Sequence, residues 1–242
     1  MLSYFERLQF FVRHAIRQRQ NARTLVQLYY WLRYFPDWQK SLDSTPVADS
    51  RPWLVYDAIK SLDRIAWDKL RICEYGVGGS TLYFAQRAAQ LISIEHNEHW
   101  ADELKSRMEN SALADWKLHV IPPRANKESH GWNPGDPDAY VSGMPEYTGQ
   151  SFKEYVCAID NYPDDYFDLV QVDGRSRPGC VKHAAPKVKP GGWIVLDDSE
   201  RERYRDAHSR LAQLGWHKHL FFGPVPYFRG FQATCIWRRP LQ

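Results

Sequence analysis

The stretch EYGVGGST, residues 74–81, combines an acid, three glycines and two small hydroxyl side chains at the end of an apolar segment. Glycines at such a bend let the backbone pass close beneath a ligand, where any Cβ would collide with it. A helix that begins just after the glycines presents free N–H groups and a partial positive charge to an anion. We therefore expect a nucleoside-type ligand site whose candidate residues are Glu74, Gly76, Gly78, Gly79, Ser80 and Thr81.

A second acid, Glu95, closes the next apolar segment, LISIEH. In doubly wound α/β folds an acid at the end of the second strand faces both hydroxyls of a ribose, and one carboxylate can accept hydrogen bonds from both. Glu95 is therefore the candidate ribose-binding residue.

Two ligand classes fit these residues. A dinucleotide site favours the pattern G-x-G-x-x-G, but Thr81 stands where the third glycine belongs. Glu74, two residues before the first glycine, would repel a pyrophosphate and suit a cationic amine. S-adenosylmethionine carries such an ammonium, together with a carboxylate for the helix N-terminus. The motif favours this methyl donor, and an NAD-linked oxidoreductase is the alternative.

Three aspartates follow two later apolar segments: Asp173 ends DLVQVD, and Asp197 and Asp198 end WIVLDD. The carboxyl ends of adjacent strands converge on one crevice in this kind of fold. Three oxygen ligands there can hold Mg²⁺, which lowers the pKa of a bound hydroxyl group. The alternative is that these acids cap the following helices or hydrogen-bond a substrate.

Basic side chains stand beside the same aspartates. Arg175, Arg177 and Arg201 either clamp a carboxylate or phosphate on a small-molecule acceptor or neutralise the aspartates. The sequence does not rank the histidines as general bases, for which the candidates are His96, His130 and His183.

The order of apolar segments indicates how these residues are positioned. Strands and helices alternate, which is typical of an α/β fold with a doubly wound, mainly parallel sheet. The last two apolar segments, 217–222 and 231–237, are joined too closely for a helical crossover, so we expect an antiparallel hairpin. The other expected strands are 71–76, 91–96, 116–121, 168–174 and 193–198, and the expected helices are 53–65, 80–89, 100–111, 151–160, 177–188 and 200–214.

A long segment rich in Pro, Gly, Asn and Asp, residues 122–150, interrupts this alternation. Loops of this length inside a compact domain usually serve function, so we expect a lid over the site. Its candidate contact residues are His130, Trp132, Asp138 and Tyr140, and Trp53 and Tyr56 are candidates for a wall of the acceptor pocket.

Residues 1–50 are expected to form a basic helical extension in front of a domain at 51–242. Between Arg7 and Arg33 there are six arginines and no acid, and apolar residues recur at helical spacing. The polar stretch from Arg17 to Thr24 predicts two helices, the second ending at Pro36, or one helix with a polar middle. The extension either packs as a cap on the domain or docks through a basic amphipathic surface on anionic lipid or an acidic protein.

Composition excludes several classes of protein. A net charge of +3 is too small to argue for a nucleic-acid partner. No apolar run approaches the roughly 20 residues of a membrane span, and charged residues interrupt the N-terminus where a signal peptide would be apolar. The four cysteines are scattered without a CxxC pair, so we expect reduced thiols in a cytoplasmic protein, with peripheral membrane contact through residues 1–50 as the alternative location.

Taken together, EYGVGGSTL with SIEH, DLVQVDGRSR and KPGGWIVLDDSERERY resemble the class I S-adenosylmethionine-dependent methyltransferase superfamily. They are most similar to a bacterial subgroup associated with small-molecule and glycan modification. The resemblance covers roughly residues 52–238 and implies a Rossmann-like methyltransferase fold, a seven-stranded sheet whose last strand enters antiparallel. It implies a methionine site at Glu74, Gly76, Gly78 and Gly79, a ribose site at Glu95, and His96 near the adenosine.

The resemblance further implies an activity, the O-methylation of a small hydroxylated or sugar-containing acceptor. Asp173, Asp197 and Arg175 are then the catalytic candidates, with Asp173 also touching the cofactor. The acids are arranged as in metal-dependent catechol-type and sugar O-methyltransferases, but the GRSR that follows Asp173 lacks a clear lysine base. A non-catalytic nucleoside-binding module, docked through the basic N-terminal helices, is a further alternative.

Overall fold

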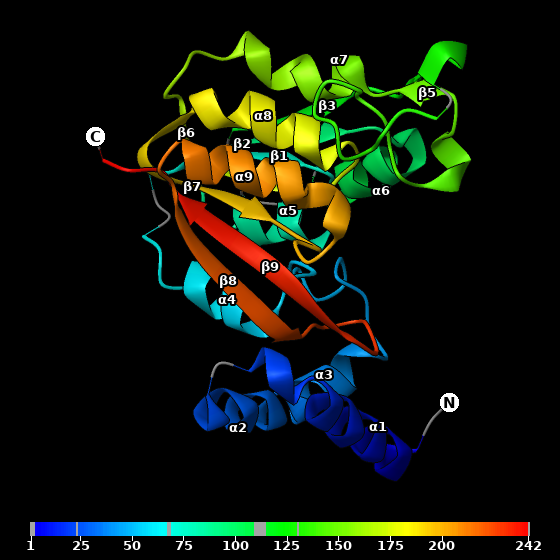
Figure 1. Cartoon of the computed structure of the whole chain (residues 1–242), viewed down its shortest axis with the longest axis vertical. Coiled ribbons are helices and arrows are strands. Elements are labelled where there is room, and N and C mark those ends of the chain that lie inside the picture. Colours follow the sequence, from blue (N-terminus) through cyan, green and yellow to red (C-terminus); the bar gives the residue numbers. More distant parts are fainter. Residues whose placement is uncertain (1–2, 23, 67–68, 109–114, 130, 242) are drawn as a thin grey trace.

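A computed structural model describes residues 3–22, 24–66, 69–108, 115–129 and 131–241 of the chain. Within these residues the centre is a seven-stranded sheet in the order β3-β2-β1-β6-β7-β9-β8 (Figure 1). The doubly wound α/β architecture predicted from the sequence is confirmed. The strands of this sheet are β1 (Arg71–Tyr75), β2 (Gln90–Glu95), β3 (Trp116–Val120), β6 (Phe167–Val172), β7 (Val188–Leu196), β8 (His217–Pro224) and β9 (Phe231–Arg238).

Six strands run in one direction and β9 runs against its two neighbours. β1 pairs in parallel with β2 and β6, and the parallel ladder continues to β3 on one side and β7 on the other. β9 is antiparallel to both β7 and β8, which confirms the predicted C-terminal hairpin. β7 begins at Val188, five residues before the strand expected at 193–198, and its ladder with β6 is irregular between Phe167 and Leu169.

Helices cover both faces of the sheet. Strand residues alternate between the faces, so Ile72 of β1 packs in one apolar cluster while Cys73 and Tyr75 pack in the other. The Ile72 face is covered by α4 (Tyr56–Leu62), α5 (Gly79–Ala85) and α6 (Glu98–Met108). The opposite face is covered by α7 (Lys153–Cys157), η4 (Ala158–Asn161), α8 (Arg177–Lys187) and α9 (Arg205–Gln213), the last preceded by η5 (Glu202–Tyr204).

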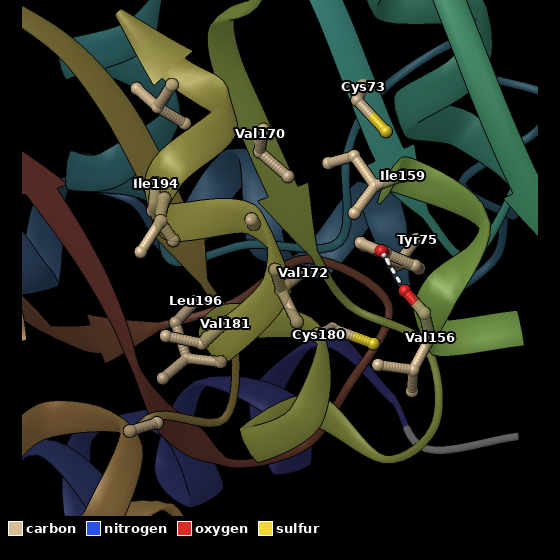
Figure 2. Packing of buried hydrophobic residues seen from close by; sticks show 14 of the residues in the cluster. Cys73, Tyr75, Val156, Ile159, Val170, Val172, Cys180, Val181, Ile194 and Leu196 are labelled. Atoms are coloured by element: carbon tan, nitrogen blue, oxygen red, sulfur yellow. Dashed lines mark hydrogen bonds between the residues drawn. The ribbon is translucent and has the colours of Figure 1, made fainter. Parts of the chain in front are cut away.

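Figure 2 shows the second of these clusters, where side chains of β1, β6, β7 and α8 meet. The hydroxyl of Tyr75 is buried there and donates to the carbonyl of Val156, 2.6 Å away. The thiols of Cys73 and Cys180 lie among aliphatic side chains in the same core. All four cysteines are free thiols, and Cys157 alone among them is half-buried rather than buried.

The N-terminal segment folds as three helices, not the two that the sequence predicted. They are α1 (Tyr4–Arg17), α2 (Leu25–Arg33) and α3 (Phe35–Ser41), with a short turn, η1 (Arg19–Asn21), between the first two. Pro36 does not end a helix; it occupies the first turn of α3, where no N–H donor is needed. Figure 1 shows the three helices beneath the tip of the β8–β9 hairpin.

Aromatic packing holds these helices to the hairpin. Trp31 is fully buried against Phe222 and Phe231 of β8 and β9. The indole of Trp38 donates to the carbonyl of Phe228 in the hairpin turn, at 2.8 Å. The extension therefore packs as a cap on the domain through one face of its helices.

The long segment after β3 is irregular but anchored. A two-stranded antiparallel pair, β4 (Arg124–Ala125) with β5 (Gln150–Ser151), closes its two ends, and η2 (Lys127–Ser129) and η3 (Pro145–Tyr147) lie between them. This pairing was not predicted, because two-residue strands leave no periodic signal. Among the described residues, no helix combines the length and the apolar character that crossing a bilayer requires.

Candidate functional site

A cavity of about 760 Å³ opens at the carboxyl ends of β1, β2, β6 and β7. This is the edge at which doubly wound sheets bind their ligands. Most of the residues predicted from the sequence line it: Gly76, Gly78, Gly79, Ser80, Glu95, His96, Asp173, Arg175, Arg177, Asp197, Asp198 and Arg201.

The bend after β1 needs glycine at two places for different reasons. Gly76 has φ +92°, and a Cβ there would lie 3.1 Å from the backbone of Gly174. At Gly78 a Cβ would meet only the ring of Trp100, 4.0 Å away, on the side of the cavity. Gly76 therefore permits the turn and the close approach of the loop after β6, while Gly78 leaves open space for a ligand.

Gly79 makes room for the linker between α3 and α4, residues 42–55. A Cβ at this position would lie 2.2 Å from the carbonyl oxygen of Arg51 and 2.3 Å from that of Pro46. The sequence interpretation assigned this glycine to the ligand; the structure shows that its missing side chain makes room for residues 46–51. The linker thereby becomes part of the cavity wall, which Pro46 and Trp53 both line.

The two hydroxyl residues of the motif fix the turn. The backbone N–H of Gly78 donates to Oγ1 of Thr81 at 3.0 Å, and Thr81 is fully buried. Ser80 lines the cavity, and its hydroxyl donates to Oε2 of Glu74 at 2.9 Å. Thr81 is thus a structural residue and not a wall of the cavity, which corrects its assignment as a ligand contact.

Glu74 lies behind the glycine bend and does not line the cavity. Its side chain is 0% exposed, with one oxygen bound by Ser80 and the other by the hydroxyl of Ser93 at 2.7 Å. Burial raises the pKa of Glu74 to about 7, although the three hydroxyl groups of Ser93, Thr81 and Ser80 favour its ionised form. The sequence interpretation, which aimed this acid at a cationic amine, is corrected: the contact would need a group that faces the cavity.

This burial has a testable cost. The pKa of Glu74 rises from 4.5 in the unfolded chain to about 7, so the folded state binds the proton more tightly. The contribution of this group to stability is therefore full below pH 4.5 and is lost as the pH rises to about 7, by at most about 3 kcal/mol.

We expect Glu74→Gln to unfold at a higher temperature than the natural chain at about pH 8, and at the same temperature near pH 4.5. Thermal unfolding followed by circular dichroism across this range checks it. The matched control is Glu98→Gln, which removes an exposed acid from α6 and should shift neither end of the range. A lower unfolding temperature for Glu74→Gln at about pH 8 would contradict the assignment of Glu74 as a buried, strained acid.

Glu95 faces the cavity from the end of β2 and is fixed by the backbone. Its Oε2 accepts from the N–H of Val77 at 2.9 Å, and its Oε1 accepts from those of His96 and Asn97 at 2.7 and 2.8 Å. Burial opposes ionisation, but these hydrogen bonds and the imidazole of His96 outweigh it and lower the pKa of Glu95. A charged carboxylate is therefore held ready at the place where the sequence predicted ribose binding.

His96 joins this acid to the long segment after β3. Its Nδ1 lies 2.7 Å from Oε1 of Glu95, and its Nε2 lies 2.9 Å from the hydroxyl of Tyr147. Tyr147 lines the cavity, and the guanidinium of Arg175 lies over its ring, 5.4 Å from the centroid. Nε2 is hydrogen-bonded, whereas Nδ1 is close to the carboxylate of Glu95 but makes no hydrogen bond among the described residues, so His96 is placed as a wall residue that links Glu95 to Tyr147.

The three aspartates meet a buried arginine. Arg177 is 6% exposed; its Nη2 lies 2.8 Å from Oδ1 of Asp173, and its Nη1 lies 3.3 Å from Oδ2 of Asp198. Arg177 also donates to three carbonyls, those of Gly174, Asp197 and Asp173. Burial alone would lower the pKa of Arg177, but the carboxylates raise it well above its ordinary value.

Asp197 is the acid that this arginine does not pair with. Its side chain lines the cavity, and Oδ1 accepts from the hydroxyl of Thr234 at 2.9 Å. Burial, with the nearby carboxylate of Asp173, raises the pKa of Asp197 well above its ordinary value, and burial raises the pKa of Asp173 to about 6 although Arg177 opposes that shift. The site therefore holds two carboxyl groups that take up a proton more readily than exposed ones.

These residues do not fit a bound Mg²⁺. The guanidinium of Arg177 lies between Asp173 and Asp198, where a cation shared by them would have to sit, and Asp198 is paired again with Arg201 at 2.7 Å. The metal site expected at Asp173, Asp197 and Asp198 is corrected: Asp173 and Asp198 are neutralised by arginine, and Asp197 is bound by Thr234 instead. Within the described ranges, the group of three acidic, His or Cys side chains close enough to share an ion is Cys157, Asp160 and His183.

Arg175 differs from the two other arginines of the site. It lines the cavity, and its Nε is buried without a hydrogen-bond partner among the described residues. No ion pair joins it to a carboxylate in that part of the chain, whereas Arg177 and Arg201 are both paired with aspartates. Of the two interpretations of these arginines, neutralisation fits Arg177 and Arg201, and anion binding fits Arg175.

The predicted lid residues lie elsewhere. Asp138 pairs with Lys182 of α8, Tyr140 hydrogen-bonds Nε2 of His183 at 3.2 Å, and the ring of Trp132 is exposed to solvent. His183 is bound on its other side by Asp160 at 2.7 Å, so it ties the segment to α8 outside the cavity. His130 lies outside the described residues.

Among the described residues of the long segment, Tyr147 lines the cavity, and no sequence pattern predicted this. Of the two expected wall residues, Trp53 lines the cavity, whereas Tyr56 is buried under the stacked ring of Tyr34. The hairpin turn and the start of β9 add Phe228 and Gln232, whose distance along the chain from the motifs gave no signal.

No protein-family profile matches the chain, and no curated protein matches its sequence. Solved structures are similar to it. An S-adenosylmethionine-dependent O-methyltransferase from Thermotoga maritima is 12% identical, with 82% of this chain and 72% of that chain covered and a TM-score of 0.50. Precorrin-6y C5,15-methyltransferase from Geobacter metallireducens is 13% identical over 74% of this chain and 86% of that chain, with a TM-score of 0.49.

A methyltransferase-like protein from Silicibacter pomeroyi is 21% identical over 80% of this chain and 92% of that chain, with a TM-score of 0.47. At such identities the likeness concerns the course of the backbone and not the chemistry of the site. The strand order, the antiparallel β9 and the likeness to the Thermotoga maritima structure agree with one another. The chain has the Rossmann-like fold of the class I S-adenosylmethionine-dependent methyltransferases.

Proposed function

We propose that the protein is an S-adenosylmethionine-dependent methyltransferase that methylates a hydroxyl group of a small hydroxylated or sugar-containing acceptor. The observation that carries the proposal is the pair of carboxylates, Glu95 and Asp173, that face one cavity from strands on either side of β1. When bound, S-adenosylmethionine supplies a methyl group on a positively charged sulfur. The residues of the chain bind the cofactor and the acceptor, orient them and balance their charges.

The two carboxylates suit the two ends of this cofactor. Glu95, preorganised by three backbone N–H groups, has lone pairs left for the ribose hydroxyls. Asp173 lines the cavity at the end of β6, beside the glycine bend; Arg177 pairs with its Oδ1, and its second oxygen takes over the ammonium contact that the sequence interpretation had given to Glu74. Arg175, which has no acid partner in the described part of the chain, suits a carboxylate of the cofactor or of the acceptor.

The same geometry disfavours NAD. A dinucleotide lays its pyrophosphate across the first glycine bend, and a carboxylate within that cavity wall would repel it. Asp173 follows β6 beside this bend: a Cβ on Gly76 would lie 3.2 Å from the backbone carbonyl carbon of Asp173, and both residues line the cavity.

The acceptor belongs over β6 and β7. If the cofactor spans from Glu95 on β2 to Asp173 on β6, the unfilled part of the cavity lies beyond Asp173, lined by Asp197, Phe228 and Gln232. A hydroxyl oxygen that takes the methyl group, while the carbon–sulfur bond breaks and S-adenosylhomocysteine leaves, must release its proton. Asp197 is placed to accept it, and its raised pKa makes it a stronger base than an exposed carboxylate. The aromatic side chains exclude water from the transfer.

We place this activity in the cytoplasm, in line with the four free thiols, which suit a reducing compartment.

The test is a pair of calorimetric titrations of the full chain, one with S-adenosylhomocysteine and one with NADH. We expect saturable one-to-one binding of the first and no heat of binding from the second. Methyl transfer from carbon-13-labelled S-adenosylmethionine is then assayed with a panel of phenols, sugars and hydroxy acids, because the chemical shift of the product methyl group distinguishes oxygen from nitrogen as its bearer. Binding of NADH in the cavity overturns the proposed activity, and transfer to amines alone overturns the O-methylation.

A further inference from the structure

The outward faces of α1 and α2 carry large apolar side chains in water. Leu25 is 85% exposed and Phe5 70% exposed, fractions that core-forming residues reach only where nothing covers them. The other exposed apolar side chains of these two helices and their ends are Tyr4, Phe10, Ile16, Val26, Tyr29, Tyr30 and Leu32.

These helices are held firmly, so the exposure is a feature of the fold and not of a loose end. The opposite face of α1 buries Phe11, and that of α2 buries Trp31, both against the hairpin residue Phe231. A capping box of Ser3 and Glu6 fixes the start of α1, and the hydroxyl of Thr24 caps α2. Each helix therefore has apolar side chains on two sides, and one of these sides is buried against the hairpin while the other is exposed.

Arginines border the exposed apolar faces. Arg13 and Arg17 follow Phe5 and Ile16 around α1, Arg19 lies in the turn after it, and Arg33 lies beside Tyr29 on α2. All four are exposed, and none is ion-paired with a carboxylate of the described residues. Arg7, on the buried face, shows the contrast: Asp43 neutralises it at 2.6 Å.

We propose that the face formed by α1 and α2 docks the protein on an anionic lipid surface. Aromatic and aliphatic side chains beside exposed arginines are the composition of helices that lie in the plane of a bilayer interface, with the rings among the headgroups. Phosphate headgroups supply the negatively charged partners that the four arginines do not find among the described carboxylates. An acidic protein would supply charge as well, but the apolar side chains spread over two helices match a plane of acyl chains better than a peptide groove.

The docking face is joined to the cavity through one element. Trp38 of α3 holds the carbonyl of Phe228, and the side chain of Phe228 lines the acceptor end of the cavity. Docking therefore places the acceptor end of the cavity in contact, through Phe228 and Trp38, with the helical segment that binds the membrane. This inference does not depend on the chemistry proposed for the cavity.

Co-sedimentation of the full chain with vesicles tests it. We expect weak binding to phosphatidylcholine vesicles and at least about a hundredfold tighter binding when about a third of the lipid is phosphatidylglycerol, because each of the four arginines near an anionic surface contributes about fivefold. Raising the salt from about 0.1 M to 0.5 M should remove most of the difference. The charge variant is Arg13→Gln/Arg17→Gln, the apolar variant is Leu25→Ser/Tyr29→Ser, and the matched control is Lys117→Gln/Leu214→Ser, which changes exposed side chains of the same kinds elsewhere.

The charge variant should lose about twentyfold on anionic vesicles only, the apolar variant should lose binding to both lipids, and the control should lose neither. Equal binding of the natural chain to both vesicle types overturns the anionic-surface proposal. An equal loss of binding in the control variant also overturns it. A third contradicting outcome is that the protein does not bind vesicles and forms a concentration-dependent dimer in light scattering, which would make the face an interface between two copies. Unchanged unfolding temperatures and S-adenosylhomocysteine titrations of the variants separate these outcomes from misfolding and from failure of the proposed activity.

Discussion

Replacing Glu95 by glutamine should weaken S-adenosylhomocysteine binding about a hundredfold, or about 3 kcal/mol, because two charge-assisted hydrogen bonds to the ribose hydroxyls are lost. The carboxylate is also the acceptor for three backbone N–H groups, and an amide presents only one acceptor atom to them. In Glu95→Gln one carboxylate oxygen becomes an NH₂ group, which donates hydrogen bonds and cannot accept them from the backbone N–H groups or from the ribose hydroxyls. Isothermal titration below the unfolding temperature of the variant measures the effect.

The ligand provides the second half of this experiment. 2′-Deoxy-S-adenosylhomocysteine lacks one of the two hydroxyls, so it should bind the natural chain about tenfold more weakly and bind Glu95→Gln with little further loss. Glu98→Gln, an exposed acid of α6 outside the cavity, is the control and should bind both ligands as the natural chain does. Losses that simply add would show that Glu95 acts through the fold of the turn and not on the ribose.

The alternation of apolar segments was enough to predict the fold. Buried strands at 71–76, 91–96 and 168–174 separated by helices leave few topologies, and the short link before 231–237 requires an antiparallel pair. These features depend on local periodicity and chain length. The pattern did not predict α3, because its seven residues make less than two helical turns. It also did not predict the pairing of β4 with β5.

The site was predicted by position along strands but not by direction of side chains. Glu74 and Glu95 both lie at or near the ends of strands at the cavity edge, and from the sequence both were predicted to contact the ligand. Alternation along β1 puts Glu74 on the side of Ile72, which packs beneath α5, and this signal was present in the sequence. Glu95 is the last residue of β2, where the chain leaves the sheet and its carboxylate can turn to the cavity.

The role of Arg177 was undecidable from sequence. Acids at two strand ends attract either a metal ion or a guanidinium, and which one they hold depends on where the helix after Asp173 begins. Ser176, with φ +47°, turns the chain so that α8 starts at Arg177 and the side chain points back across the strand ends. The spacing of four between Asp173 and Arg177 was the available hint, although the two residues do not share a helix.

Arg177→Ala should destabilise the protein by about 3–5 kcal/mol, since it leaves buried carboxylates without their counter-charge. For a domain of this size such a loss lowers the unfolding temperature by about 10 °C. Arg201→Ala is the matched control: it removes a guanidinium from the same Asp198, but one that is 38% exposed, and should cost less than about 1 kcal/mol. Differential scanning calorimetry compares the three chains.

Divalent cations distinguish a guanidinium site from a metal site more sharply than either variant alone. In the natural chain Arg177 occupies the position between Asp173 and Asp198, so millimolar Mg²⁺ or EDTA should change neither unfolding temperature nor methyl transfer. In Arg177→Ala the same carboxylates face an emptied position, and Mg²⁺ should recover part of the lost stability, because carboxylate oxygens are its preferred ligands. Recovery should be absent in Arg201→Ala. If EDTA destabilises the natural chain, the acids hold a metal after all, and Arg177 must lie elsewhere when it is bound.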